Sequence, residues 1–281
     1  RQMCIRDRYK FNPQKDMLPL FGDSHNGHKS FIDLIAAEAE VTVEDILGTD
    51  LFLYNRMKGS IWGRDSEYFS CPRIDNLESA YLSLKALLNS ESTAAVQMLC
   101  VFDNEEVGSV AANAADSSFV QDVLERIASS FQLDFKILLA NSLLVSADNA
   151  HAVHPNHPEK SDLTNMVYMN EGIVIKHQAG LKYTTDGLSE AIFKKMCKDL
   201  GILYQDYTNR SDQRGGSTLG AILQSHISIP SIDIGLAQLA MHSTVELAGV
   251  KDIEYMLRAL IKYYAVSYTH LRAHETVLDL V

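Results

Sequence analysis

The chain has 281 residues, 46% of them hydrophobic, so it can bury one large core or one core plus a smaller appended unit. Its net charge of -11 argues against nucleic acid or an anionic membrane as a partner, because phosphate groups are bound through clustered Lys and Arg. An acidic surface of this kind mostly serves solubility.

Helical and extended hydrophobic patterns alternate along the chain. Apolar residues recur at helical spacing in 30–40 and 78–88, whereas 94–103 is a nearly continuous apolar run, as in a buried strand. The remaining elements are expected in the order helix 108–131, strand 142–148, strand 173–177, helix 188–202, strand 227–235 and helix 245–265. Strands separated by helices predict an α/β fold whose central sheet is largely parallel or mixed and is flanked by helices.

The two ends of the chain lack any periodicity that joins them to their neighbours. The segments 1–8 and 266–281 look like peptides translated from sequencing-adapter DNA, so we expect both to be non-native. His270 and His274 have the i, i+4 spacing of a helical metal pair, but they lie in this tail and are excluded as ligands.

The cysteines and the hydropathy bear on cellular location. The four cysteines are scattered with no CxxC pair, which fits a reducing compartment better than a disulfide framework. No apolar run approaches the ~18 residues of a spanning helix, and the start lacks the layout of a signal peptide. We therefore expect a cytoplasmic protein without a membrane partner.

The stretch FDNEEVGS places Asp103, Glu105 and Glu106 directly after the predicted strand 94–103. Ligands of open α/β sheets collect beyond the carboxyl ends of strands. One of two adjacent glutamates at such a point can bind a metal ion while its neighbour faces the water on that metal. The alternative is a solvated loop in which Glu106 lies near a helix N-terminus.

Three further polar residues stand at predicted strand or helix ends. Asp75 precedes a helix, Asp148 follows a strand and His242 follows the strand 227–235. Carboxylates with a histidine suit a pair of divalent ions such as zinc or manganese. Singly, Asp75 could be a helix N-cap and His242 a core histidine, but four such residues at four element ends favour a metal site.

Six segments together resemble the aspartyl aminopeptidase family of dinuclear zinc exopeptidases, over about residues 9 to 265. They occur in the family's order and are PRIDNL, FDNEEVGS, SADNAHAVHPN, GIVIKHQAGLKY, RGGSTLG and LAQLAMHS. The resemblance implies the dizinc exopeptidase fold and two Zn²⁺ per subunit, with Mn²⁺ or Co²⁺ as alternatives.

Matched position by position, the resemblance implies a role for each candidate residue. Asp75 bridges both metals, Asp148 completes the shell of one, and Glu106 with His242 completes that of the other. Glu105 is the general base.

The resemblance also assigns a pocket for the side chain of the substrate's N-terminal residue. His151, Lys176 and Tyr183 line it, and a cation with two further donors suits a carboxylate. Lys176 could instead be a solvated lysine at a strand end. The GGSTLG segment becomes a backbone wall of the active site, and Asp103 supports the turn that carries the glutamates.

Two family features have no counterpart in this sequence. The upstream GAHTDSP-type motif, which holds the remaining zinc histidine, is absent, so we expect the stretch as given to be inactive. Most of the inserted dimerisation domain is absent too. We expect residues 9–68 to be the end of that domain and residues 69–265 to be the C-terminal part of the catalytic domain.

The implied function is a metal-dependent aminopeptidase that releases acidic N-terminal residues, Asp or Glu, from peptides and forms a homo-oligomer, a dodecamer in the family. One alternative is a related dimetal aminopeptidase with broader or hydrophobic preference. Another is a non-catalytic family member that acts as an assembly or cargo-binding subunit. Cleavage of aspartyl, glutamyl and leucyl amides, together with metal content, distinguishes the three.

Overall fold

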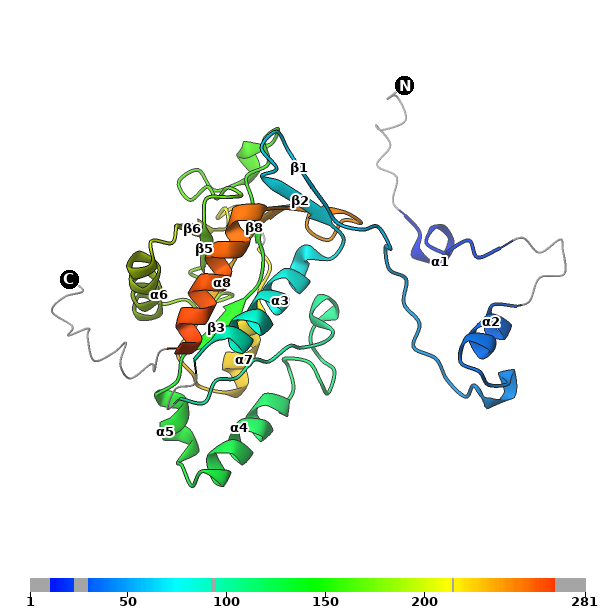
Figure 1. The fold of residues 1–281 in the computed structure, drawn as a ribbon, viewed down its shortest axis with the longest axis horizontal. Helices are drawn as coiled ribbons and strands as arrows, with labels where there is room; N and C mark the ends of the chain where they lie inside the picture. Colours follow the sequence, from blue (N-terminus) through cyan, green and yellow to red (C-terminus); the bar gives the residue numbers. More distant parts are fainter. Residues whose placement is uncertain (1–10, 23–29, 92–94, 214, 266–281) are drawn as a thin grey trace. The chain divides into compact units, whose positions relative to one another are not determined.

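The computed structural model describes residues 11–22, 30–91, 95–213 and 215–265 (Figure 1). The chain divides into two compact units, Arg1–Tyr54 and Asn55–Val281. The boundary expected between residues 68 and 69 lies within the second unit. The identity of the residues before it, as the end of an inserted domain, stays a prediction.

Several sequence-based expectations fall outside the described residues. They concern the terminal segments 1–8 and 266–281, with His270 and His274. Within the described ranges, no helix is long and apolar enough to cross a bilayer.

The first unit contains two helices and one 3-10 turn among its described residues, namely α1 (Pro13–Asp16), α2 (Phe31–Glu38) and η3 (Val43–Asp45). The helix α2 confirms the one expected over 30–40. Its start is set by a capping box, in which the Ser30 side chain accepts the Asp33 N–H and the Asp33 carboxylate accepts the Ser30 N–H.

A four-stranded mixed sheet lies at the centre of the second unit, in the order β3 (Leu144–Ala147), β7 (Ser231–Gly235), β5 (Ile173–His177), β6 (Tyr204–Thr208). The pairs β3/β7 and β5/β6 are parallel, and β5/β7 is antiparallel. Ile173 and Ile175 enter the main core while Val174 joins a separate cluster with Ala150 and Ala237. This burial on both faces explains the unbroken apolar run in β5.

A second sheet has five strands, in the order β1 (Ser60–Trp62), β2 (Tyr68–Cys71), β9 (Glu246–Gly249), β8 (Ala237–Leu239), β4 (Ala150–His151). Within the described residues of this sheet, β4 and β8 pair in parallel and the other neighbouring strands are antiparallel. The chain passes from β3 to β4 through Asp148, and from β7 to β8 through Leu236, so one parallel pair continues from the first sheet into the second. Asp148 therefore lies at the junction of the two sheets.

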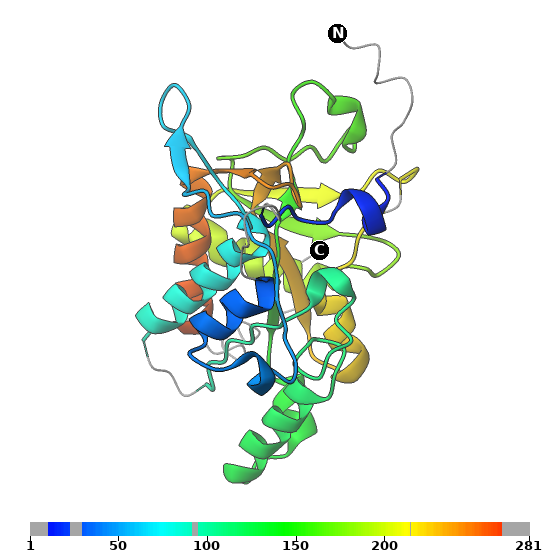
Figure 2. The same ribbon diagram turned by 90° about the vertical axis from the view of Figure 1, so that its right-hand side faces the viewer.

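The helices of the second unit are α3 (Ile74–Asn89), α4 (Phe119–Ser130), α5 (Phe135–Ala140), α6 (Gly187–Leu200), α7 (Leu219–His226) and α8 (Val250–Ala265), with 3-10 turns η4 (Glu105–Val107) and η5 (Pro158–Lys160). The helices α3 and α8 run side by side in both views (Figures 1 and 2). Leu82, Phe193 and Met256 join α3, α6 and α8 to the central sheet. Burial of each such side chain contributes about 1.5–3 kcal/mol.

The structure corrects three expected elements. Described residues 95–103 form no strand: Met98, Cys100 and Phe102 pack at alternate positions on a core cluster, but the run has no ladder partner. The helix expected over 108–131 starts only at Phe119, because the preceding residues form turns. The helix expected over 245–265 starts at Val250, because the residues before it pair as β9 with β2 and β8.

Candidate metal centre

Asp75 lies in the first turn of α3, held in a non-helical conformation with φ -78 and ψ 113. Its backbone N–H donates to Glu246 Oε2 at 2.9 Å. The next residue, Asn76, donates from Nδ2 to the carbonyl of Ala147 at 2.8 Å, directly before the sheet junction. The turn is thus fastened to both sheets, and it holds the Asp75 side chain at only 5% exposure.

Glu105 and Glu106 lie in the turn η4, which is closed at both ends by left-handed residues, Asn104 (φ 61) and Gly108 (φ 109). Asp103 Oδ1 accepts the Asn104 N–H at 2.8 Å, which confirms its expected support of this turn. This short turn stands where a strand was expected to lead directly into a helix. Both of its glutamates line the same cavity.

Asp148 and His242 follow strands that pass from the first sheet to the second. The backbone N–H of Asp148 donates to the carbonyl of Ile234 at 2.9 Å. His242 comes shortly after β8 in a left-handed conformation, with φ 65. Its N–H donates to Glu246 Oε1 at 2.7 Å.

Three of the predicted ligands converge, and we call Asp75, Glu106 and His242 the cavity cluster. Its donor atoms all lie within 4.8 Å of one another. His242 Nε2 is 3.0 Å from Asp75 Oδ2 and 3.2 Å from Glu106 Oε1. The negative charge of Asp148 acts on the same Asp75 carboxyl, so Asp75 is linked electrostatically to this fourth predicted ligand.

The carboxylates of this region destabilise one another's charge. Burial, and then the negative charges of Asp148 and Glu106, raise the pKa of Asp75 to about 8. Burial and the same two neighbours also raise the pKa of Glu105. A divalent cation would offset this repulsion, and carboxylate oxygens with an imidazole nitrogen are a donor set that zinc binds. The residues present therefore fit zinc.

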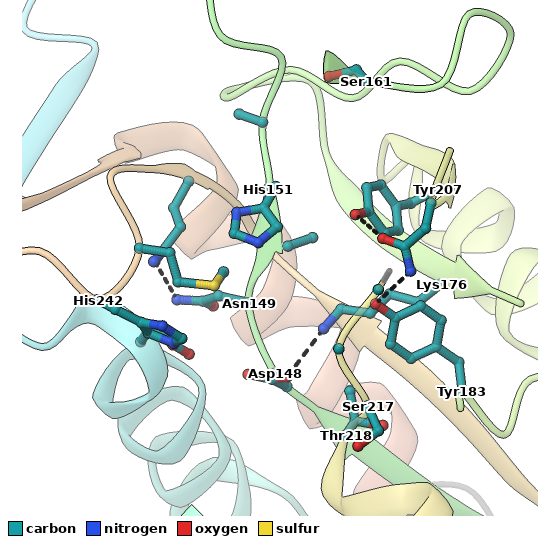
Figure 3. Close-up of a pocket in the computed structure, with 18 of the residues that line it drawn as sticks. Asp148, Asn149, His151, Ser161, Lys176, Tyr183, Tyr207, Ser217, Thr218 and His242 are labelled. Atoms are coloured by element: carbon teal, nitrogen blue, oxygen red, sulfur yellow. Dashed lines mark hydrogen bonds and ion pairs between the residues drawn. The ribbon is translucent and has the colours of Figure 1, made fainter. Parts of the chain in front are cut away.

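The cavity cluster opens into a cavity of about 630 Å³ that also contains the predicted substrate residues His151, Lys176 and Tyr183 (Figure 3). Lys176 is only 2% exposed; its Nζ is 3.2 Å from Asp148 Oδ2 and 5.5 Å from the centre of the Tyr183 ring. Desolvation of the imidazole inside the cavity, and then the positive charge of Lys176, lower the pKa of His151. A buried ammonium group thus lies among polar side chains next to the predicted ligands.

Two further cavity residues were missed by the sequence analysis. Tyr207 donates from its hydroxyl to Asn209 Oδ1 at 2.7 Å, and Asn209 Nδ2 donates to the Tyr183 hydroxyl at 3.4 Å (Figure 3). Burial raises the pKa of Tyr207, so it stays a neutral donor. Tyr207 belongs to β6, whose sequence YQDYT lacks the apolar alternation that predicts a strand, so the sequence offered no periodic signal for it.

The GGST segment forms a wall of the cavity, as expected, through Gly215, Gly216, Ser217 and Thr218. Asp233, which is fully buried, holds this wall in place. Its carboxylate accepts the Thr218 hydroxyl at 2.5 Å, and the N–H and hydroxyl of Thr184 at 2.5 and 2.8 Å. The wall and the segment that carries Tyr183 are therefore fastened to the same strand, β7.

A second group of similar composition, which we call the α6 cluster, consists of His177, Glu190 and Asp206. Its donor atoms also lie within 4.8 Å of one another, but Lys194 lies among them. Lys194 Nζ is 2.5 Å from Glu190 Oε1 and 2.8 Å from Asp206 Oδ1. The group lies outside the cavity wall.

Residues 7–264 match the family described as aminopeptidase I zinc metalloprotease (M18). The chain is 42% identical over 266 residues to a probable M18 family aminopeptidase 2 of Clostridium acetobutylicum, covering 92% of this chain and 61% of that protein. It is 36% identical over 263 residues to the protein of the same name from Mycobacterium leprae, covering 92% and 62%. The chain thus spans about three fifths of the length of these curated relatives.

Solved structures share the fold. A chain of the cryo-EM structure of the Ape4 and Nbr1 complex matches with a TM-score of 0.80 and 31% identity, over 91% of this chain and 52% of that one. The S. cerevisiae mApe1 dodecamer matches with 0.75 and 25%, over 86% and 56%. Aminopeptidase I from Clostridium acetobutylicum matches with 0.72 and 24%, over 88% and 57%. These matches confirm the expected fold class.

Proposed function

Because the chain belongs to the M18 family of aminopeptidase I zinc metalloproteases, we propose that it carries most of the active site of an aminopeptidase that releases acidic N-terminal residues from peptides. The observation that carries the proposal is the convergence of the cavity cluster with Lys176 in one cavity. A metal site next to a buried cation suits a substrate whose scissile amide lies beside a carboxylate side chain.

Asp75, Glu106 and His242 would hold one zinc ion, and Asp75 with Asp148 would contribute to a second. The electrostatic influence of both Asp148 and Glu106 on Asp75 supports its role as the residue shared between two ions. Zinc supplies Lewis-acid polarisation of the scissile carbonyl and lowers the pKa of the attacking water. Mn²⁺ and Co²⁺ are alternatives for the same donors.

Glu105 is the proposed general base. It takes a proton from the water whose oxygen bonds to the amide carbon, and it returns that proton to the amine nitrogen as the C–N bond breaks. Its carboxylate lines the cavity beside the cavity cluster.

Lys176 is the proposed determinant of acidic specificity, with His151 and Tyr183 as polar neighbours. An ammonium group that is 2% exposed can form a charge-assisted contact with an aspartyl or glutamyl side chain. Tyr183 fixes one side of the pocket through its hydrogen bond with Asn209.

One contact favours a second candidate, an aminopeptidase with broader preference. Lys176 already pairs with Asp148 at 3.2 Å. If that pair persists when substrate binds, the charge of Lys176 stabilises a metal ligand and does not select an acidic side chain.

The experiment is to purify the whole protein, determine zinc by elemental analysis and measure kcat/KM on aspartyl, glutamyl and leucyl amides. Two zinc ions per subunit with preference for the acidic amides is the expected result. Comparable rates on all three amides would favour the broader enzyme. A protein without zinc or activity would favour the non-catalytic binding subunit.

We also propose that the protein assembles as a homo-oligomer in the cytoplasm, with residues 9–68 belonging to the dimerisation domain. Similarity to the mApe1 dodecamer supports the assembly. The described cysteines, Cys71, Cys100 and Cys197, are free thiols, which supports a reducing compartment. Light scattering on the whole protein tests the assembly, for which we expect the mass of a dodecamer.

A further inference from the structure

Glu246, the first residue of β9, joins the backbones of two predicted metal ligands. Its Oε2 accepts the N–H of Asp75 at 2.9 Å, and its Oε1 accepts the N–H of His242 at 2.7 Å. The residue is 2% exposed. A buried carboxylate that accepts two backbone N–H groups makes charge-assisted hydrogen bonds, which are stronger than neutral ones.

The strand pairing explains why Glu246 reaches both ligands. The strand β9 lies between β2 and β8, with Glu246 opposite Cys71 and Leu247 opposite Leu239. Cys71 ends the strand that leads to Asp75, and Leu239 ends the strand that leads to His242. Glu246 is therefore placed at the end of the sheet from which both ligand segments emerge.

Both ligand segments have backbone conformations that need external support. His242 has φ 65, in the left-handed region that residues with a side chain rarely adopt, and Ala240 just before it has φ 59. Asp75 is non-helical within the first turn of a helix. Such conformations persist where surrounding contacts hold them, and Glu246 supplies one contact to each ligand.

Glu246 does not belong to the cavity cluster, and its two oxygens accept the backbone N–H groups of two members of that cluster. We propose that Glu246 is a positioning residue. It raises zinc affinity by holding the backbones of Asp75 and His242 at the separation that lets both side chains bind the same ion. This inference rests on the proposed metal centre. It goes beyond that centre because a residue that is not a predicted ligand would control the distance between two ligands.

The chain offers a matched control in Asp252, in the first turn of α8. Its carboxylate is fully buried and also accepts two backbone N–H groups, from Asn170 at 2.6 Å and Gly172 at 2.9 Å. These contacts support a segment without predicted ligands. Glu246→Gln and Asp252→Asn therefore make the same chemical change, at places that differ in their connection to the metal centre.

The test measures zinc dissociation constants of the whole protein by competition with a chelator, together with thermal unfolding of the metal-free form. Glu246→Gln is expected to weaken zinc binding by about 10- to 100-fold, as loss of residues that orient ligands does. Asp252→Asn is expected to lower the unfolding temperature without changing zinc affinity. Equal effects of both variants on zinc affinity, or an unchanged affinity in Glu246→Gln, would overturn the inference.

A second variant covers the case in which Glu246→Gln fails to fold. Glu246→Asp keeps the charge but shortens the reach, so it is expected to retain the fold and to bind zinc more weakly than Asp252→Asn does. Zinc affinity equal to that of Asp252→Asn would overturn the inference. A wild-type protein that binds no zinc would overturn the proposed function as well, which separates the two failures.

Discussion

The cavity cluster and the α6 cluster contain the same donor types at similar separations, but they differ in what neutralises their negative charge. In the α6 cluster, Lys194 binds both carboxylates. Burial lowers the pKa of Lys194, but its hydrogen bonds to Asp206 and Glu190 outweigh this effect and raise it, so the lysine stays charged. The α6 cluster therefore carries its own cation.

The cavity cluster lacks such a partner. Among the described residues, no lysine or arginine forms an ion pair with Asp75 or Glu106; both carboxyl groups lie near His242, and Asp148 adds negative charge beside Asp75. Two acids and a histidine within reach of one another are thus not enough to define a metal site. An uncompensated charge, next to a cavity that a substrate can enter, separates the two cases.

The largest expected effect comes from Glu105→Gln in the whole protein. If catalysis belongs to the cavity cluster, kcat should fall by about 10²- to 10⁴-fold, because the general base is lost, while zinc content stays unchanged. Glu190→Gln in the α6 cluster is the control and should leave kcat unchanged. Steady-state kinetics with elemental analysis of both variants checks this; unchanged turnover in Glu105→Gln would remove that residue from its role.

The next largest effect is on zinc affinity, and it differs between His242 of the cavity cluster and His177 of the α6 cluster. His242→Ala should weaken zinc binding by more than roughly 100-fold, because it removes a direct ligand. Loss of a residue that only orients a ligand typically costs up to roughly 100-fold. His177→Ala should leave zinc affinity unchanged, since Lys194 supplies the charge there. Chelator competition measures both; a loss of zinc on substitution of His177 would break the comparison.

Lys176→Ala tests whether this buried lysine of the cavity wall, which pairs with Asp148, selects acidic substrates. If Lys176 binds the substrate's carboxylate, the variant should lose about 1.5–3 kcal/mol of transition-state stabilisation on aspartyl amides and far less on leucyl amides. Values of kcat/KM on both substrates give the answer. Equal losses would show that Lys176 serves Asp148 instead.

The smallest effect is expected from Lys194→Met, which removes the internal cation of the α6 cluster. The protein should lose about 1 kcal/mol of stability, because the lysine is only partly buried and its ion pairs are partly screened. The same variant should gain a weak additional zinc site. Denaturant unfolding and elemental analysis test the two effects, and unchanged zinc stoichiometry at high zinc concentration would mean that charge balance alone does not separate the clusters.

Much of the fold followed from local patterns. The run IVIKH predicted β5 at its observed ends because both faces of that strand are buried, and the helical spacing in 188–202 located α6 to within two residues. The expected strand 94–103 failed for a different reason. Its alternating residues do face a core cluster, but a strand also requires a hydrogen-bonded neighbour, which a local pattern does not contain.

The sequence by itself supplied the candidates for the centre, because six ordered motifs resemble those of a dinuclear zinc exopeptidase family and point to Asp75, Glu105, Glu106, Asp148 and His242, whose roles stay predictions. Only the tertiary structure decided which residues hold those groups in position and which carboxylates have their negative charge neutralised by a nearby lysine. Glu246 reaches Asp75 across 171 positions of the chain because two strands pair in one register, and Lys194 of α6 reaches Asp206 and the ring of Tyr204 in β6 through the tertiary fold. Contacts of this kind depend on strand register and helix packing, which local periodicity does not specify.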